Sequence, residues 1–284
     1  MGLVGGAYCW AVLAHLQIGA GDFNWAIFAA RDLLAHKNPY ARPMQLYPLP
    51  AALFGLPFVL LPGPLAGGLF YGISSGLLAY GLLRNGYHRL LIFLAYPYWA
   101  GALTAQWMPL LAACSFFPLL LPATMAKPQI GLPVFLRYPT RRGIVACIAV
   151  LVASFLVLPH WPILWSEHFG SYDRFIPLLV LPGPLLLLAL LRYRDGDALF
   201  LLLVAIMPQR WFYDTFVLWL IPKTRREIAY TAFFSWGAGI WRWYHFPHSY
   251  AEVGRWTVDF MYLPMLAIVL ARAWQSKASI IPAS

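Results

Sequence analysis

Four ionisable residues lie beside or within long apolar stretches of the chain: Asp22, Lys127, Arg210 and Asp214. An ionised side chain at the centre of a membrane helix costs about 2.5–3.5 kcal/mol on insertion scales, so each of the four needs an explanation. Lys127 stands where proline and glycine interrupt helical structure, which would leave backbone groups free beside a cation. Arg210 precedes a predicted helix and could present its guanidinium fork to a phosphate. These two cations indicate binding of an anionic phosphate.

Each of these residues also has a purely structural interpretation. Lys127 could be an interfacial lysine that extends its ammonium into water. Arg210 and Asp214 are four residues apart, so on a helix they would face one another and neutralise each other. Asp22 would stand near the N-terminus of a helix, where the helix dipole favours a carboxylate cap. The residues alone leave both interpretations open.

The motifs of soluble catalysis are missing from the sequence. It has no glycine-rich phosphate loop, nucleophile elbow or cluster of metal ligands. Its three cysteines, Cys9, Cys114 and Cys147, stand in apolar stretches without the spacing of a metal site. We therefore expect neither a metal nor a cofactor.

The composition is that of an integral membrane protein. Of the 284 residues, 61% are hydrophobic and 11% are charged, whereas charged residues make up about 25% of a soluble domain. The mean hydropathy of +0.67 excludes disorder and nucleic-acid-binding domains. If a span with its connection takes roughly 25–30 residues, the length allows about eight to ten membrane segments. We predict a single all-α domain over residues 1–284, a polytopic transmembrane helix bundle.

The placement of lysine and arginine predicts the orientation of the chain, because basic residues near short loops stay on the cytoplasmic side. The N-terminus is then cytoplasmic, and the long polar connection at residues 21–48 is extracytoplasmic. The residues assigned to the cytoplasm are Arg84, Arg89, Arg137, Arg141, Arg142, Arg192, Arg194, Lys223, Arg225, Arg226, Arg272 and Lys277. Those assigned to the outer side are Arg31, Lys37, Arg42, Arg174, Arg210, Arg242 and Arg255, with Lys127 unassigned.

The first connection is predicted to contain an amphipathic helix at the membrane interface. Apolar residues recur at helical spacing between Phe23 and Leu34, with Arg31 and Asp32 elsewhere on the surface. Asn38-Pro39-Tyr40 would end this helix with a turn. The apolar run at residues 49–62 is the best candidate for a segment that does not cross the membrane.

Ordered landmarks along residues 20–220 resemble a known family. They are, in chain order, Asp22 after the first apolar run, Asn38-Pro39-Tyr40, Tyr47-Pro48, Pro57, Gln106, Lys127-Pro128-Gln129, Pro208 and Trp211. Their order resembles the polytopic glycosyltransferases of the GT-C superfamily, specifically family 87, whose members use polyprenyl-phosphate mannose. Where that family carries a Trp-x-His-Tyr type of sequence, this chain has Trp211-Phe212-Tyr213-Asp214 and no histidine.

The resemblance implies a GT-C-like fold and a membrane glycosyltransferase of a bacterial inner membrane. It would transfer a mannose-like sugar from a polyprenyl-phosphate donor to a lipid or glycan acceptor at the outer face, with inversion at the anomeric carbon. Asp22 would be the general base, and Lys127 and Arg210 would bind the donor phosphate. The further substrate-binding residues on this interpretation are Tyr47, Gln106, Gln129, Tyr213 and Asp214.

A second hypothesis is a non-catalytic, GT-C-like membrane subunit that serves as a scaffold in a larger complex with other membrane subunits. The short chain and the missing histidine favour it. A transporter is a weaker third hypothesis, because the sequence shows no internal repeat with matching broken helices. The partners expected on the enzymatic hypothesis are the lipid-linked donor, an acceptor and membrane lipids, without nucleic acid.

Overall fold

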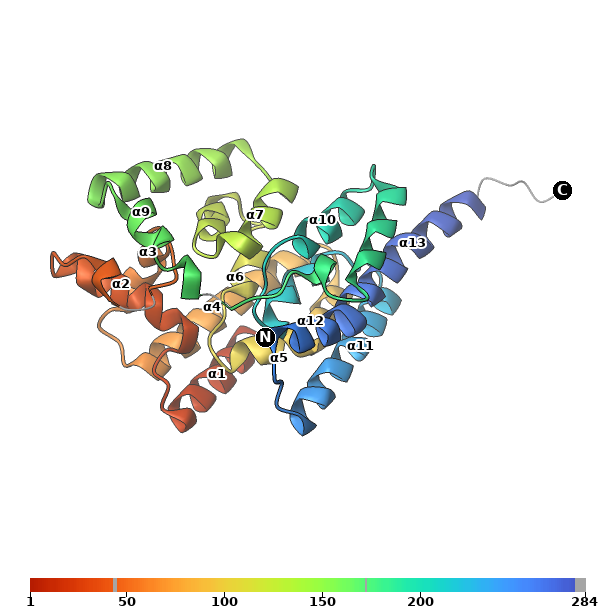
Figure 1. Cartoon of the computed structure of the whole chain (residues 1–284), viewed down its shortest axis with the longest axis horizontal. Coiled ribbons are helices and arrows are strands. Elements are labelled where there is room, and N and C mark those ends of the chain that lie inside the picture. Colours follow the sequence, from red (N-terminus) through yellow and green to blue (C-terminus); the bar gives the residue numbers. More distant parts are fainter. Residues whose placement is uncertain (43–44, 172, 279–284) are drawn as a thin grey trace. The chain divides into compact units, whose positions relative to one another are not determined.

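A computed structural model of the chain describes residues 1–42, 45–171 and 173–278 (Figure 1). These residues are mainly helical, and the β-type pairing among them is an isolated antiparallel bridge between Phe175 and Gln209. The all-α fold class is therefore confirmed. By their contacts, the described residues divide into two compact units, unit 1 (residues 1–86 and 98–173) and unit 2 (residues 87–97 and 174–278).

Unit 1 contains three long helices, α1, α4 and α8, with shorter helices between them and after them. Several of the short elements are 3-10 helices, labelled η. In chain order the elements are α1 (Gly2–Leu16), η1 (Gly21–Phe23), α2 (Asn24–Leu34), η2 (Pro39–Ala41), α3 (Ala51–Gly55), η3 (Leu56–Phe58), α4 (Gly63–Leu83), most of α5 (Tyr96–Ala102), α6 (Met108–Ala113), η5 (Pro118–Met125), α7 (Pro128–Arg137), α8 (Arg141–Val157), α9 (Trp161–Ser166) and η6 (Phe169–Ser171).

Helices α1 and α4 pack against each other through glycine. Gly68 and Gly72 of α4 are four residues apart and face Gly6 of α1. A Cβ atom on Gly6 would lie 2.9 Å from the Gly68 carbonyl oxygen and 2.9 Å from the Gly72 Cα atom, so a side chain there would push the helices apart. Small residues at this spacing let two helix backbones approach closely. This packing holds the end of α1, after which Asp22 follows.

A tight elbow joins α1 to the next helical segment. Gly19 and Gly21 have φ angles of 64° and 60°, in the left-handed region that glycine adopts at little cost. The Asn24 side chain holds the elbow by accepting a hydrogen bond of 2.9 Å from the Ala20 backbone N–H. The bend between the two helical segments is 81°. Asp22 lies in this elbow.

The helix predicted between Phe23 and Leu34 is confirmed as η1 and α2. The predicted position of Asp32 on the surface is wrong, because this side chain is buried and accepts a hydrogen bond of 2.7 Å from Arg42. The turn at residues 38–40 is also present, where the Asn38 side chain accepts from the Tyr40 N–H at 3.0 Å. The run at residues 49–62 forms only the short helices α3 and η3.

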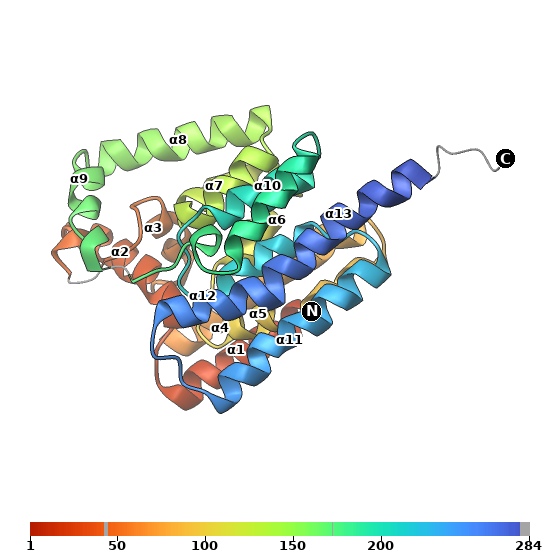
Figure 2. The same ribbon diagram turned by 45° about the vertical axis from the view of Figure 1, so that its right-hand side comes forward.

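The longest helical segments of unit 2 are α11 and the continuous run from α12 to α13. Helices α11 and α13 run side by side in this unit (Figure 2). A π-helical turn, η10, continues α12 into α13. In chain order the elements are η4 (Tyr87–Leu94), η7 (Pro177–Leu179), η8 (Gly183–Arg192), α10 (Gly196–Ala205), η9 (Phe212–Leu220), α11 (Arg225–Tyr244), α12 (Tyr250–Thr257), η10 (Val258–Tyr262) and α13 (Leu263–Ala278).

Two helical segments among the described residues are long and apolar enough to cross a membrane, Gly63–Leu83 and Tyr250–Arg272. The bent pair Gly2–Leu16 and Gly21–Leu34 makes a third if it counts as one span. Other apolar runs are divided because proline interrupts the helical hydrogen bonds, as at residues 107–136. Of the predicted bundle of about eight to ten segments, the confirmed part is an all-helical fold with two or three candidate membrane spans.

Candidate functional site

The Asp22 carboxylate points toward Tyr47 in unit 1. The Tyr47 hydroxyl donates a hydrogen bond to Asp22 Oδ2, and the Asp22 backbone N–H donates to the Thr104 carbonyl oxygen at 2.8 Å. Neither η1 nor α2 has a hydrogen bond from a side-chain cap at its N-terminus. Asp22 therefore lies near a helix N-terminus as predicted but makes no capping hydrogen bond there, and Tyr47 is its side-chain partner.

Asp22 also differs from the acidic residues that serve packing. It takes part in none of the ion pairs between described residues, and its side chain is half-buried. The acids that do form such a pair, with a lysine or arginine within 4 Å, include Asp32, Asp195, Asp197, Glu227 and Asp259. A carboxylate that accepts from a phenol retains lone pairs that can take a proton.

Lys127 is buried within unit 1, with 4% of its surface exposed. It precedes the first residue of α7, and its Nζ donates a hydrogen bond of 3.0 Å to Gln106 Oε1. The interpretation of Lys127 as a lysine that extends its ammonium into water is therefore wrong. Burying an ammonium costs free energy unless polar groups accept hydrogen bonds from it. Gln106 is one such group for Lys127.

Thr104 connects the surroundings of Asp22 to those of Lys127. The Thr104 carbonyl oxygen accepts from the Asp22 backbone, while the Thr104 hydroxyl accepts from Gln106 Nε2 at 3.2 Å. Because Gln106 also holds Lys127, one short chain of hydrogen bonds joins the carboxylate region to the ammonium. Four residues predicted from the sequence thus lie in one cluster, together with Thr104, which the sequence analysis missed. We call Asp22, Tyr47, Thr104, Gln106 and Lys127 the Asp22 cluster.

A buried indole forms one wall of the Asp22 cluster. Trp107 is fully buried, and its ring stacks on Tyr47 at a centroid distance of 5.8 Å. The same indole packs edge to face against Phe23 at 5.7 Å and against Phe70 at 5.1 Å. Its Nε1 is a buried donor without a hydrogen-bond partner. The sequence analysis missed Trp107 because an aromatic residue inside an apolar run is indistinguishable from core, although its position directly after Gln106 was a usable signal.

An apolar groove opens in unit 1 two residues after Tyr47. Its volume is about 330 Å³, and it is formed by the segment from Leu49 to Leu56 and by α8 from Ala149 to Val157. Gln129, the remaining predicted residue of this unit, lies half-buried in the first turn of α7, two residues after Lys127. Unit 1 therefore combines a carboxylate, a buried ammonium and an apolar groove.

The other predicted residues belong to unit 2. Arg210 precedes the 3-10 helix η9, so the prediction that Arg210 and Asp214 face each other on one helix is wrong. Asp214 Oδ2 instead accepts from the Arg210 backbone N–H at 2.9 Å, and Arg210 Nε donates to the Tyr250 hydroxyl at 3.3 Å. Asp214 is buried and Tyr213 beside it is half-buried.

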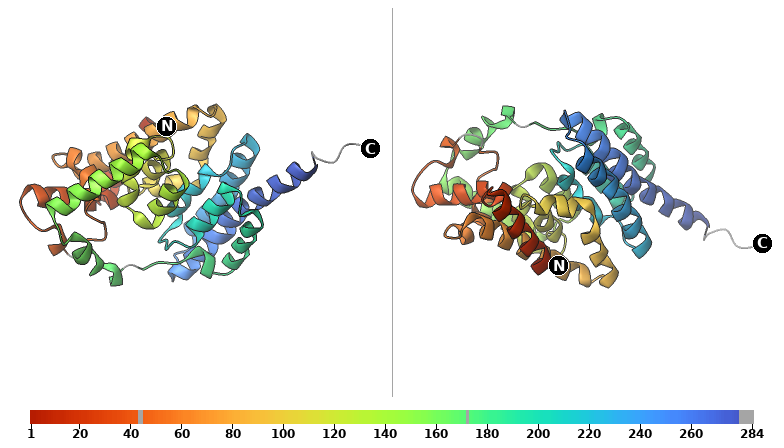
Figure 3. Two further views of the ribbon diagram at one scale, coloured as in Figure 1. Left: turned by 90° about the horizontal axis from the view of Figure 1, so that it is seen from above. Right: turned by 90° about the horizontal axis from the view of Figure 1, so that it is seen from below.

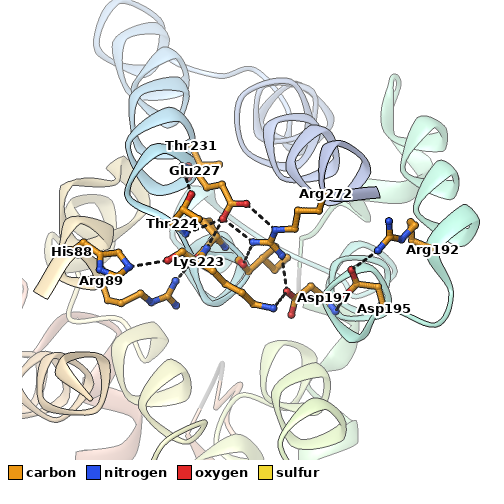
Figure 4. Close-up of polar contacts among 12 residues, drawn as sticks. His88, Arg89, Arg192, Asp195, Asp197, Lys223, Thr224, Glu227, Thr231 and Arg272 are labelled. Carbon is orange, nitrogen blue, oxygen red and sulfur yellow. Dashed lines mark hydrogen bonds and ion pairs between the residues drawn. The ribbon is translucent and has the colours of Figure 1, made fainter. Parts of the chain in front are cut away.

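Unit 2 holds a second polar cluster, which the sequence analysis did not predict (Figure 4). Arg272 donates to Asp197 Oδ2 at 2.9 Å and to both Glu227 carboxylate oxygens at 2.8 Å. Lys223 Nζ lies 2.6 Å from the same Asp197 oxygen. Glu227 also completes the N-terminal cap of α11 with Thr224. We call Asp197, Lys223, Thr224, Glu227 and Arg272 the Arg272 network.

The pKa of Glu227 shows how strongly this network holds its charges. Burial alone would raise the pKa of the carboxyl, but hydrogen bonds from Arg272 and from the Lys223 and Thr224 backbone N–H groups outweigh it. The pKa falls from its usual 4.5 to about 2. The ionised form is thus stabilised by the fold, as expected for a structural ion pair.

Comparisons with protein-family models, with characterised proteins and with solved structures find no match for this chain. The two polar clusters are therefore the basis for inferring a function. The Asp22 cluster is the better candidate for chemistry, because its carboxylate is accessible and has no cation paired with it among the described residues.

Proposed function

We propose that the chain is a membrane glycosyltransferase that transfers a mannose-like sugar from a polyprenyl-phosphate donor to a lipid or glycan acceptor. The observation that carries this proposal is the Asp22 cluster. It combines a half-buried carboxylate held by Tyr47 with a buried ammonium held by Gln106. General-base transfer to a hydroxyl with departure of a phosphate needs one group of each kind.

Asp22 would act on the acceptor. As the acceptor oxygen attacks the anomeric carbon, its proton passes to an Asp22 carboxylate oxygen. The hydrogen bond from the Tyr47 hydroxyl to Asp22 Oδ2 orients the carboxylate for this step. The new bond joins the acceptor oxygen to the anomeric carbon, and the bond from that carbon to the phosphate oxygen breaks. A single displacement inverts the anomeric carbon and needs no covalent nucleophile on the protein.

Lys127 would act on the donor. The polyprenyl phosphate leaves with the electron pair of the broken bond, and a nearby ammonium stabilises the charge that develops on it. A phosphate oxygen would take the place of the Gln106 amide oxygen as acceptor from Lys127 Nζ. The apolar groove after Tyr47 offers a surface of matching chemistry for the first isoprenoid units of the donor.

The proposal also gives the protein an orientation in the membrane and assigns roles to residues of unit 2. The chain would be a GT-C-like, multi-pass protein of a bacterial inner membrane, with a cytoplasmic N-terminus and residues 21–48 at the outer face. The 81° elbow between α1 and α2 supports an α2 that lies along the membrane interface. Arg210 would be a second phosphate ligand, and Gln129, Tyr213 and Asp214 would contact the substrates.

The proposal is tested by the change Asp22→Asn in the purified full chain. Asparagine keeps the shape of the side chain but loses the basic carboxylate, so transfer from polyprenyl-phosphate mannose should fall by about 10²–10⁴-fold. Mass spectrometry of the acceptor measures it. The matched control is Asp195→Asn, because Asp195 is a true helix cap whose side chain accepts from the Asp197 N–H at 2.9 Å. Asparagine caps as well as aspartate, so this variant should transfer sugar at the wild-type rate.

The alternative function is a non-catalytic scaffold within a membrane complex. One observation favours it: protein groups already hold both the carboxylate and the ammonium of the Asp22 cluster. On that account the wild type transfers no sugar, and Asp22→Asn only lowers the temperature of unfolding. Wild-type transfer that Asp22→Asn abolishes without a change in unfolding would exclude the scaffold.

A further inference from the structure

The same three residues, Thr-Arg-Arg, begin two long helices, one in each unit. Thr140 precedes α8 and accepts from the Gly143 N–H at 3.1 Å, and Thr224 precedes α11 and accepts from the Glu227 N–H at 3.2 Å. In both places the two arginines that follow are exposed. Each threonine hydroxyl thus accepts a hydrogen bond from a backbone N–H group in the first turn of its helix, and the two arginines beside it are exposed.

These arginines, Arg141, Arg142, Arg225 and Arg226, form no ion pair with an acid in the described part of the chain. Cations in the first turn of a helix also oppose its dipole, which is unfavourable for folding. Two pairs of arginines therefore occupy positions that folding disfavours, which indicates an external anion.

Below each pair, the helix presents apolar side chains on its outer face. In α8, Val145 is 65% exposed and Leu156 is 80% exposed, and the left view of Figure 3 shows this helix running along the outside of unit 1. In α11, Phe233 is 76% exposed and Ile240 is 58% exposed. Such faces are suited to hydrocarbon rather than to water or nucleic acid.

The start of α11 lies at the end of a candidate membrane span. Arg272, the last residue of the span Tyr250–Arg272, binds Glu227 in the first turn of α11. Because Arg272 and Lys223 neutralise Asp197 and Glu227, the acids of this region do not cancel the exposed arginines. Arg225 and Arg226 thus lie beside the end of a candidate span, where a membrane would change from hydrocarbon to headgroups.

We infer that the Thr-Arg-Arg starts of α8 and α11 are two binding sites for anionic phospholipid. At each site the two guanidinium groups would bind the headgroup phosphate, and an acyl chain would lie along the apolar face below. Phospholipid fits better than free phosphate, because only a lipid uses both the arginines and the exposed apolar side chains. This inference does not depend on the proposed sugar transfer.

The test is a lipid titration of the purified full chain in detergent, followed by native mass spectrometry with phosphatidylglycerol and phosphatidylcholine. The wild type should bind two phosphatidylglycerol molecules more tightly than phosphatidylcholine. Near an anionic surface each basic residue contributes about 1 kcal/mol, so Arg225→Gln with Arg226→Gln should weaken one site about thirtyfold. Arg141→Gln with Arg142→Gln should weaken the other equally, and all four changes together should remove the preference.

The control is Lys37→Gln with Arg174→Gln, which removes two exposed cations elsewhere and should leave both sites intact. The arginine variants should unfold at the wild-type temperature or above it, because the substitutions relieve the helix dipoles. Equal wild-type affinity for the two lipids would overturn the inference, and so would an equal loss in the control. If a variant fails to fold, the wild type decides: 0.5 M salt should abolish the preference, and a preference that survives it contradicts the inference.

Discussion

The Asp22 cluster of unit 1 and the Arg272 network of unit 2 handle buried charge in opposite ways. In the Arg272 network, each acid lies within 2.9 Å of a cation, and Arg272 joins Asp197 to Glu227. In the Asp22 cluster, the carboxylate is held by a phenol and the ammonium by an amide. The neutral Tyr47 hydroxyl orients the Asp22 carboxylate without neutralising it, so this carboxylate stays available to a substrate. An ion pair instead neutralises both of its members.

The two clusters also connect different segments of the chain. Arg272 connects the last part of a span to the starts of α10 and α11 through three acceptors, including the Ile221 carbonyl oxygen at 2.9 Å. The Asp22 cluster instead joins the elbow after α1 to the residue that precedes α7. The first arrangement suits stability and the second suits binding.

The largest effect on stability is expected from Arg272→Met. Methionine keeps much of the length but leaves Asp197 and Glu227 without their shared cation, and breaking such a pair costs about 3–5 kcal/mol. Chemical unfolding in detergent measures the loss. In the control Arg255→Met, the cation removed lies 3.9 Å from Asp259, and the Arg255 side chain is 72% exposed. This substitution should lower the free energy of unfolding by less than about 1 kcal/mol. Equal losses in the two variants would break the comparison.

A smaller effect is expected from acid. The folded-state pKa of Glu227 is about 2, below its usual 4.5, so its contribution to stability is complete above pH 4.5. That contribution is lost as the pH falls from 4.5 through 2. The unfolding temperature of the wild type should therefore drop in this window, and that of Glu227→Gln should drop less. Parallel pH curves for the two proteins would contradict the role assigned to Glu227.

The smallest effect is expected from Tyr47→Phe. Removing the hydroxyl deletes a hydrogen bond to the Asp22 carboxylate, and hydrogen bonds to charged groups contribute about 1.5–3 kcal/mol. Transfer should fall by about tenfold to a hundredfold, while the ring and its stacking on Trp107 remain in place. Kinetics at saturating donor measure the loss. A fall as deep as that of Asp22→Asn would make Tyr47, rather than Asp22, the decisive group.

Local signals in the sequence predicted the elements around the Asp22 cluster. The helix from Phe23 to Leu34 followed from apolar spacing, and the turn at Asn38 followed from turn residues. The membrane character followed from composition. Position in the chain also indicated Asp22, Gln106 and Lys127, although their contacts join segments that are distant in sequence.

Long-range partners were the part that the sequence could not predict. The burial of Asp32 depends on Arg42, ten residues away, and surface placement was the natural expectation for a lone acid in an amphipathic helix. Arg272 and Glu227 are 45 residues apart, so no local pattern links them. The prediction that Arg210 and Asp214 share one helix was wrong because η9 begins only at Phe212. Residue 209, directly before Arg210, forms a β-bridge with Phe175 instead.

The most direct test of the account compares Asp22→Asn with Arg272→Met in one preparation of the full chain. Sugar transfer per folded molecule and the free energy of unfolding are measured for both variants. Asp22→Asn should lose about 10²–10⁴-fold in transfer and keep the wild-type stability, while Arg272→Met should keep transfer per folded molecule and lose about 3–5 kcal/mol. Wild-type transfer by Asp22→Asn, or a loss of stability as large as that of Arg272→Met, would contradict the assignment of chemistry to the Asp22 cluster.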